Sequence, residues 1–299
     1  MRALQTANRA GFTLVELIIV MVITGIIAGM VALFIRVPIQ SYVDNVARAE
    51  LSDVADTALH RLSRELRLAL PNSVRVSGDG RYIEFLLTKT GGRYLAEEDE
   101  LSVGNVLSFS GTSSNPLLFD VVGNMPTGRQ AILPGDSIVV YNLGPGFDPV
   151  DAYNCTGTAP NRVCNRATVA SLAGNTITLL DNPFQNQSST PDGASFPSPG
   201  SRFQVVSSAV TYYCNASGNG QLMRYAGYPI QASQPVSAIA APLATAPSQA
   251  RVADRVQACS FTFTSLANVQ RGLVSLLMTL GAGNETLTLQ QQVHVDNAP

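Results

Sequence analysis

The feature that most constrains this chain is an uncharged, apolar run of nineteen residues near its N-terminus, 17–35 (LIIVMVITGIIAGMVALFI). About twenty such residues suffice for a helix to cross a bilayer. No other stretch approaches this length, so we expect one transmembrane helix, over 12–36. The leader, 1–11, carries two arginines and no acid, which favours a cytoplasmic leader and a periplasmic remainder. The leader lacks an apolar stretch of its own, so an ordinary cleaved secretory signal fits poorly.

Glu16 is the one acidic residue inside the apolar segment, at the fifth position counted from Phe12. A carboxylate there costs a few kcal/mol unless it reaches the lipid headgroups or meets a cation. The simpler interpretation is an acid that snorkels to the headgroups. The functional interpretation comes from its neighbours, because the string 11–17 (GFTLVEL) follows a short basic leader and opens an apolar helix. In residues, position and hydropathy, this string closely resembles the processing motif of type IV prepilins.

The resemblance implies roles for three residues. Prepilin peptidase would cut between Gly11 and Phe12 and methylate the new amine of Phe12. The mature chain would lose two arginines, so its formal charge would change from −2 to −4. Glu16 would help the subunit dock against the N-terminal amine of a neighbour, as a buried carboxylate is stabilised by a nearby cation. Major pilins usually carry a mid-span proline, but the first proline here is Pro38, so any bend should lie near the exit from the membrane.

An amphipathic helix is expected to continue the span over 37–70, making one helix of fifty to sixty residues. Its apolar residues recur at three- and four-residue spacing, and polar residues occupy the other faces. The pair Pro71-Asn72 is expected to stop it. The apolar stripe consists of Leu51, Ala55, Leu59, Leu62, Leu66 and Ala69.

Beyond the helix, 71–299 alternates with period two between turn signals and predicts a β-rich periplasmic globular head. No strand–helix–strand alternation occurs, so we expect an α+β fold with a mostly antiparallel sheet. The segments 181–201 and 231–250 are rich in Ser, Pro and Ala and read as long surface loops. The predicted strands are Arg81–Leu87, Arg93–Leu95, Ser137–Leu143, Thr168–Ser171, Thr176–Leu180, Val210–Cys214, Gln221–Tyr225, Cys259–Thr264, Leu273–Leu280 and Glu285–Val295.

Composition and motifs exclude several function classes. Charged residues make up only 13% of the chain, and Lys89 is the single lysine, so no basic surface for nucleic acid is expected. The sequence contains no G-x-S-x-G, H-E-x-x-H, Walker A or nucleotide-binding glycine motif. His60 and His294 are expected to be structural; His294 shares a strand face with Asp296, but no nucleophile is marked out to join them. We therefore expect no enzymatic activity and no cofactor.

All four cysteines follow the span, on the side where disulfides form. Three pairings are open, and we favour Cys155–Cys164 and Cys214–Cys259. A zinc site is the alternative, but no C-x-x-C occurs and neither histidine is near a cysteine in sequence. The acidic run 97–100 is expected to be a solvated turn, because it lacks the spacing and glycine of a calcium loop.

The layout after the helix resembles one group of minor pilins and pseudopilins. The resemblance rests on a YYC strand, an LMRY strand, the string VADRVQACSFTF and a closing QQVHVDNAP. It is greatest for the MshO-type minor pilins of the MSHA (mannose-sensitive haemagglutinin) pilus, with PilW-type minor pilins and GspJ-type type II secretion pseudopilins as relatives. It implies an inner-membrane subunit whose partners are prepilin peptidase, other minor and major pilins, and an assembly platform. A type II secretion pseudopilin and a membrane-tethered periplasmic enzyme or receptor are the alternatives.

Overall fold

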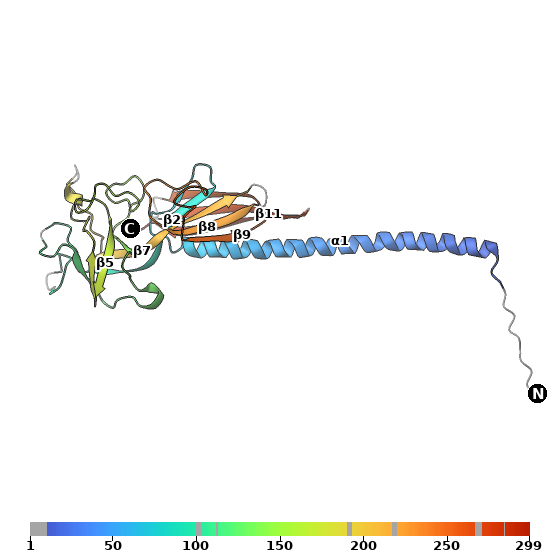
Figure 1. The fold of residues 1–299 in the computed structure, drawn as a ribbon, viewed down its shortest axis with the longest axis horizontal. Coiled ribbons are helices and arrows are strands. Elements are labelled where there is room, and N and C mark those ends of the chain that lie inside the picture. The colour runs from blue at the N-terminus through green and yellow to red at the C-terminus, as the bar shows by residue number, and fades with distance from the viewer. Residues whose placement is uncertain are drawn as a thin grey trace, which may run out of the picture.

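A computed structural model describes residues 11–99, 103–111, 113–189, 193–216, 220–266, 271–283 and 285–299. One long helix projects from an elongated β head, and the N-terminal end of that helix lies far from the head (Figure 1). Residues 1–10 of the leader, the middle of the predicted hairpin turn at 217–219, and Glu100 of the acidic run lie outside the described residues.

The helix α1, Leu14–Leu66, is continuous over 53 residues and contains Pro38. It ends four residues before the predicted boundary. The backbone of the next residues pairs with the sheet instead, because Leu70 N–H donates to Leu86 O at 2.8 Å and Thr88 N–H donates to Leu68 O at 2.9 Å. Tertiary hydrogen bonding, rather than Pro71, therefore ends the helix. Five residues of the predicted apolar stripe are buried and Ala69 is half-buried, as the periodicity indicated.

Every strand pairing in the described part of the head is antiparallel, and the α+β prediction is confirmed. One sheet has nine strands in the order β1-β2-β3-β6-β5-β4-β7-β8-β9, and a second has the order β10-β11-β12. The strands are β1 Arg75–Val76, β2 Tyr82–Tyr94, β3 Leu118–Val122, β4 Ser137–Val139, β5 Arg166–Ala173, β6 Thr176–Leu179, β7 Arg202–Asn215, β8 Gln221–Tyr228, β9 Ser248–Ala253, β10 Val256–Leu266, β11 Arg271–Ala282 and β12 Glu285–Asp296.

The part of the head farthest from the N-terminus is a closed ring of strands. Because β2 pairs with both β3 and β7, and β7 also pairs with β4, the strands β2-β3-β6-β5-β4-β7 return to their start. Such closure leaves no free sheet edge within the ring. A separate apolar cluster that includes Phe119, Phe184 and Phe203 fills this lobe.

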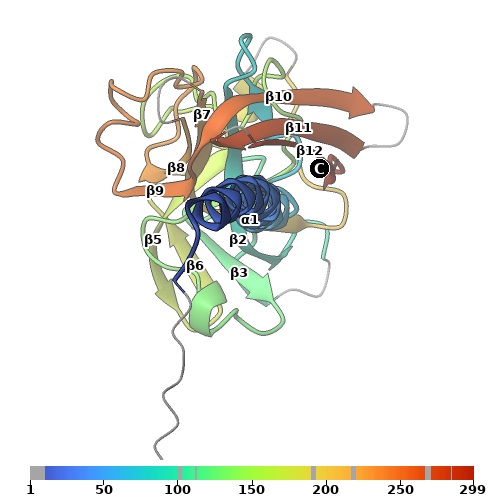
Figure 2. The ribbon, with the colours of Figure 1, turned by 90° about the vertical axis from the view of Figure 1, so that its right-hand side faces the viewer.

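The part of the head nearest the apolar first half of α1 is built around the second half of the same helix. Its buried stripe shares one apolar cluster with residues of β2, β7 and β8 and with the β10–β12 sheet. Seen along the helix axis, β10–β12 cover one side of α1, while β8 and β9 lie on another (Figure 2). The disulfide Cys214–Cys259 joins β7 to β10 and so links the two sheets covalently.

Two predictions for the head are corrected. The segment between Tyr82 and Tyr94 is one strand rather than two, because Gly91 and Gly92 continue the pairing with β7. A Cβ on Gly92 would lie 2.8 Å from the Phe203 ring, so these glycines allow close packing rather than a turn. The strand predicted over 137–143 ends at Val139, shortly before Tyr141 takes a φ of 52°. Strands β1, β3 and β9 were not singled out by the sequence pattern.

The segment 181–201 is also not a simple surface loop. Asn182, Phe184 and Gln187 are buried, and Asn182 Nδ2 donates to Ser108 O at 2.9 Å and to Pro116 O at 2.8 Å. The polar composition of this segment does not indicate burial. Its side-chain amides are nevertheless buried, because they donate hydrogen bonds to backbone carbonyls of the protein instead of to water. The segment 231–250 is largely irregular, as expected, although Leu243 is buried and β9 begins at Ser248.

Candidate functional site

The Gly11–Phe12 peptide bond lies outside the helix, at its exposed N-terminal end. Thr13 is the N-cap, and its Oγ1 accepts a hydrogen bond from Glu16 N–H at 3.3 Å. Phe12 is 81% exposed. A Cβ added to Gly11 would meet no atom within 4 Å, so the fold does not require glycine at this position. A requirement for glycine here must therefore come from whatever binds this segment.

Glu16 lies in the first turn of α1 and is exposed. Its side chain makes no ion pair or hydrogen bond with another described residue, while the positive end of the helix dipole favours an acid there. The cap was not predicted from the sequence, although Thr13-x-x-Glu16 has the spacing of a capping box. The structure contains the Thr13 half of that box only. The carboxylate is thus free to meet a cation from outside the chain.

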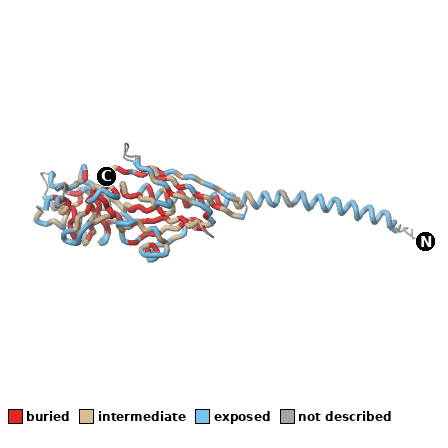
Figure 3. The backbone as a smooth tube through the Cα atoms, turned by 90° about the horizontal axis from the view of Figure 1, so that it is seen from above, coloured by how far each residue is buried: buried red, intermediate tan, exposed pale blue. Residues whose placement is uncertain are grey.

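The apolar run 17–35 is exposed along its whole length and touches no part of the head (Figure 3). The helix that contains it is the one described helix long and apolar enough to cross a membrane, with a mean hydropathy of 2.9 over its best window. Such a continuous apolar surface has to be covered by lipid or by other apolar helices. Thr24 Oγ1 donates to Val20 O at 2.6 Å, so its hydroxyl is satisfied within the helix.

A second feature that was not predicted from the sequence lies within this run. Gly25 and Gly29 form a G-x-x-x-G spacing, and a Cβ on either would meet nothing within 4 Å. Glycine in a helix interior costs about 1 kcal/mol relative to alanine. In apolar helices this spacing lets another helix backbone approach closely. This G-x-x-x-G spacing could have been identified from the sequence, because both glycines lie inside the apolar run.

Ion pairs fasten the second half of α1 to the head. Near the end closer to the apolar half, Arg48 pairs with Glu285 of β12 at 3.2 Å. Near the other end, Glu65 Oε2 accepts from Arg224 Nε at 2.8 Å and from Tyr212 Oη at 3.0 Å. Burial is the main cause that raises the pKa of Tyr212, and the Glu65 carboxylate raises it further. The free apolar half of α1 is therefore continuous with a half that is fixed to the head.

The cysteines are joined as the sequence favoured, Cys155 to Cys164 and Cys214 to Cys259. Cys155–Cys164 closes a small loop that also contains the bridge between Thr156 and Val163. No free thiol remains among the four cysteines.

The remaining candidate residues are dispersed. His60 is exposed on α1 beside Asp56, while His294 and Asp296 are exposed on β12. In the part of the chain that the structure describes, no three His, Cys, Asp or Glu side chains are grouped to hold a metal ion.

Two carboxylates of the acidic run 97–100 accept hydrogen bonds from other groups of the protein. Glu97 Oε1 accepts from Ser108 and Ser110 at 2.9 Å each. Asp99 pairs with Arg93 at 3.0 Å and accepts the Ala96 N–H at 3.0 Å. These bonds order the turn by contacts within the head.

Comparison with known proteins finds one match, which falls on this N-terminal site. Residues 6–32 match the family described as the prokaryotic N-terminal methylation motif. No curated protein and no solved structure matches the chain. The match supports a type IV pilin-like, membrane-anchored subunit, which implies processing by prepilin peptidase and association with other pilins in general terms.

Proposed function

We propose that this chain is a minor pilin subunit that takes part in assembling a type IV pilus and has no catalytic role. The observation that carries the proposal is the exposed apolar half of α1, which begins at a non-helical Gly11–Phe12 bond and runs without a break into a half clamped to the head. An isolated anchor needs no rigid coupling to its head. A subunit drawn from the membrane into a filament does, because force on the helix must reach the head.

In this proposal, the leader stays in the cytoplasm, the span lies in the inner membrane and the head folds in the periplasm. Prepilin peptidase cuts between Gly11 and Phe12 and methylates Phe12. The Glu16 carboxylate then meets the new terminal amine of a neighbouring subunit in an apolar setting, where an opposite charge stabilises it strongly. The match at 6–32 and the unpaired Glu16 side chain support this sequence of events.

Mass spectrometry of the purified N-terminus tests the processing step. The expected mature chain starts with N-methyl-phenylalanine at position 12. A chain that keeps Met1 in cells with active prepilin peptidase would overturn the proposal and favour a membrane-tethered periplasmic enzyme or receptor.

The filament system is proposed from the resemblance of the head to MshO-type minor pilins, which makes an MSHA-type pilus our choice. Deleting the chain should then reduce surface pili, and the chain should be present in sheared pilus preparations. Loss of secreted enzymes with normal pili would instead identify a type II secretion pseudopilin, which shares the N-terminal motif.

A further inference from the structure

The outward face of α1, alongside the head, carries two sets of opposite charge with identical spacing. Each set has three residues that recur every third position, and the second set follows the first by eleven residues. Eleven residues make close to three helical turns, so both sets lie on the same face, roughly 16 Å apart. The acidic set is Glu50, Asp53 and Asp56, and the basic set is Arg61, Arg64 and Arg67.

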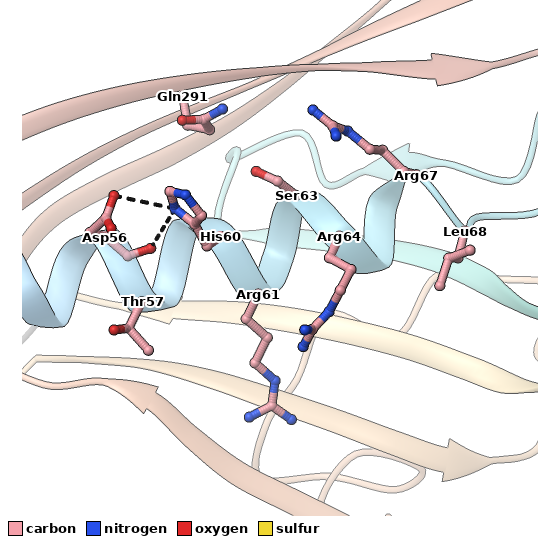
Figure 4. A pocket seen from close by; sticks show the side chains of 9 residues that line it. All are labelled: Asp56, Thr57, His60, Arg61, Ser63, Arg64, Arg67, Leu68 and Gln291. Atoms are coloured by element: carbon pink, nitrogen blue, oxygen red, sulfur yellow. Dashed lines mark hydrogen bonds and ion pairs between the residues drawn. The ribbon is translucent and has the colours of Figure 1, made fainter. Parts of the chain in front are cut away.

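This face points away from the core of the head. Ala55 and Leu62 of the same helix are buried against the head. At 100° per residue, Asp53 and Arg64 lie on the opposite side of the helix, and both are exposed. An open groove of about 900 Å³ runs along the basic set. Figure 4 shows its arginines extending from the helix, with strands of the head on both sides.

Contacts within the chain account for only part of the pattern. Asp53, Arg64 and Arg67 make no side-chain hydrogen bond or ion pair with another described residue. Two members form exposed and therefore weak pairs, Glu50 with Arg255 at 3.2 Å and Asp56 with His60 at 3.2 Å. Arg61 makes a longer contact of 3.5 Å with the largely buried Glu65. The helix dipole favours arginines in the last turns, but it gives no reason for acids three turns earlier.

We propose that this face docks a second copy of the chain, with the helices parallel and staggered by eleven residues. The acidic set of one copy then meets the basic set of the other, with Asp53 beside Arg64 at the centre. Because each helix buries its opposite face in its own head, the helices lie back to back and the heads lie outside. Charge complementarity identifies the occupant, since the chain carries both halves of the match.

The stagger also means that two copies can pair in an assembled filament but not while both are anchored in the membrane. The inference therefore rests on the proposed function. Two spans anchored in one bilayer lie at equal depth, because a shift of roughly 16 Å would draw about half of one span out of a hydrocarbon core about 30 Å thick. At equal depth, acids face acids and arginines face arginines. The pattern therefore disfavours pairing in the membrane and favours it once subunits are staggered in a filament.

Thiol cross-linking between two differently tagged copies tests the register. One copy carries Asp53→Cys and the other Arg64→Cys, and these are the only free thiols because the native cysteines are paired. After treatment with a short bismaleimide, we expect a mixed 53–64 product in sheared filaments and little in the inner-membrane fraction. The matched control replaces Arg64→Cys with Thr57→Cys, which lies in the same groove but in the wrong register.

Charge reversal tests whether the acidic and basic sets cause this register. Adding Arg67→Glu, which removes no side-chain contact with another described residue, to the Arg64→Cys copy should lower the 53–64 product at least fivefold. Adding Asp56→Arg, at the position that faces residue 67 in this register, to the Asp53→Cys copy should then restore it. Equal 53–57 or 53–53 products, capture of a different subunit, or no mixed product in filaments that contain both copies would overturn the proposal. Uncut chains that remain in the membrane would overturn the proposed function instead.

Discussion

Glu65 of α1 and Arg224 of β8 form an ion pair of 2.8 Å in which only 13% and 11% of the two side chains are exposed. The residues are 159 positions apart, and the pair links the fixed half of the helix to the nine-stranded sheet. Tyr212 of β7 donates to the same carboxylate oxygen, so two neighbouring strands hold one helical residue.

The change Arg224→Met should lower the free energy of unfolding by about 3 kcal/mol, because it leaves the Glu65 charge poorly compensated in a largely buried position. Denaturant unfolding of the full chain in detergent measures this. The control is Arg48→Gln, which removes the exposed pair with Glu285 and should cost less than about 1 kcal/mol. Equal, small losses would show that the Glu65–Arg224 pair does not fasten the helix.

The change Gly11→Ile should leave the fold intact and block processing, since the structure has open space at this position. We expect a chain that retains its leader but has an unchanged thermal unfolding midpoint. Mass spectrometry and circular dichroism give the two readouts. Gly78→Ala, at another open position, serves as the control and should be processed normally. Normal cleavage of Gly11→Ile would contradict a glycine requirement by the peptidase.

Capping and docking at the N-terminus can be separated. Glu16→Gln removes the charge but keeps the Thr13–Glu16 backbone contact, so it should be cut normally yet enter filaments poorly. Thr13→Ala removes the cap, at a cost of about 1 kcal/mol to the helix, but keeps the charge. The ratio of filament to inner-membrane protein measures each. A larger loss for Thr13→Ala than for Glu16→Gln would assign the role of Glu16 to helix structure.

The two disulfides should contribute unequally to stability. Their sequence separations are 45 for Cys214–Cys259 and 9 for Cys155–Cys164. In the chain-entropy model these loops correspond to about 4 and about 2.7 kcal/mol. Replacing each pair by alanines and measuring denaturant unfolding should therefore give the larger loss for Cys214–Cys259. The reverse order would show that strain or unfolded-state structure outweighs loop entropy.

Asp120 should make the ring of strands sensitive to acid. Burial raises the pKa of its carboxyl, but hydrogen bonds from Thr176 and Asn105 together outweigh burial and lower the pKa below its usual 3.8. A carboxyl with a lowered pKa stabilises the fold above its unfolded value, and that contribution is lost as pH falls through the folded value. Asp120→Asn should thus be less stable than the parent at pH 7, with a smaller difference near pH 3. A constant difference across this range would refute the ionic contribution.

The stretch of chain with the strongest local pattern was predicted most accurately. The apolar stripe ending near Leu66 follows from helical periodicity, and the C-terminal meander β10–β12 follows from period two between turns. Errors arose where partners distant in sequence decide the outcome. Gly91-Gly92 reads as a turn but pairs with β7, and the polar loop around Asn182 is buried because it satisfies carbonyls from other loops.

The sequence by itself determined the N-terminal half of this protein's long helix: one apolar span, the string around Gly11 and Phe12, and a carboxylate at position 16. These are properties of contiguous residues, because hydropathy sums along the chain and a processing motif is a short linear segment. Only the tertiary structure decided that β2 and β7 close a ring, that Glu65 meets Arg224, and that the charge sets of α1 face outward. Each depends on which surfaces the chain buries, and burial is set by partners tens to hundreds of residues away.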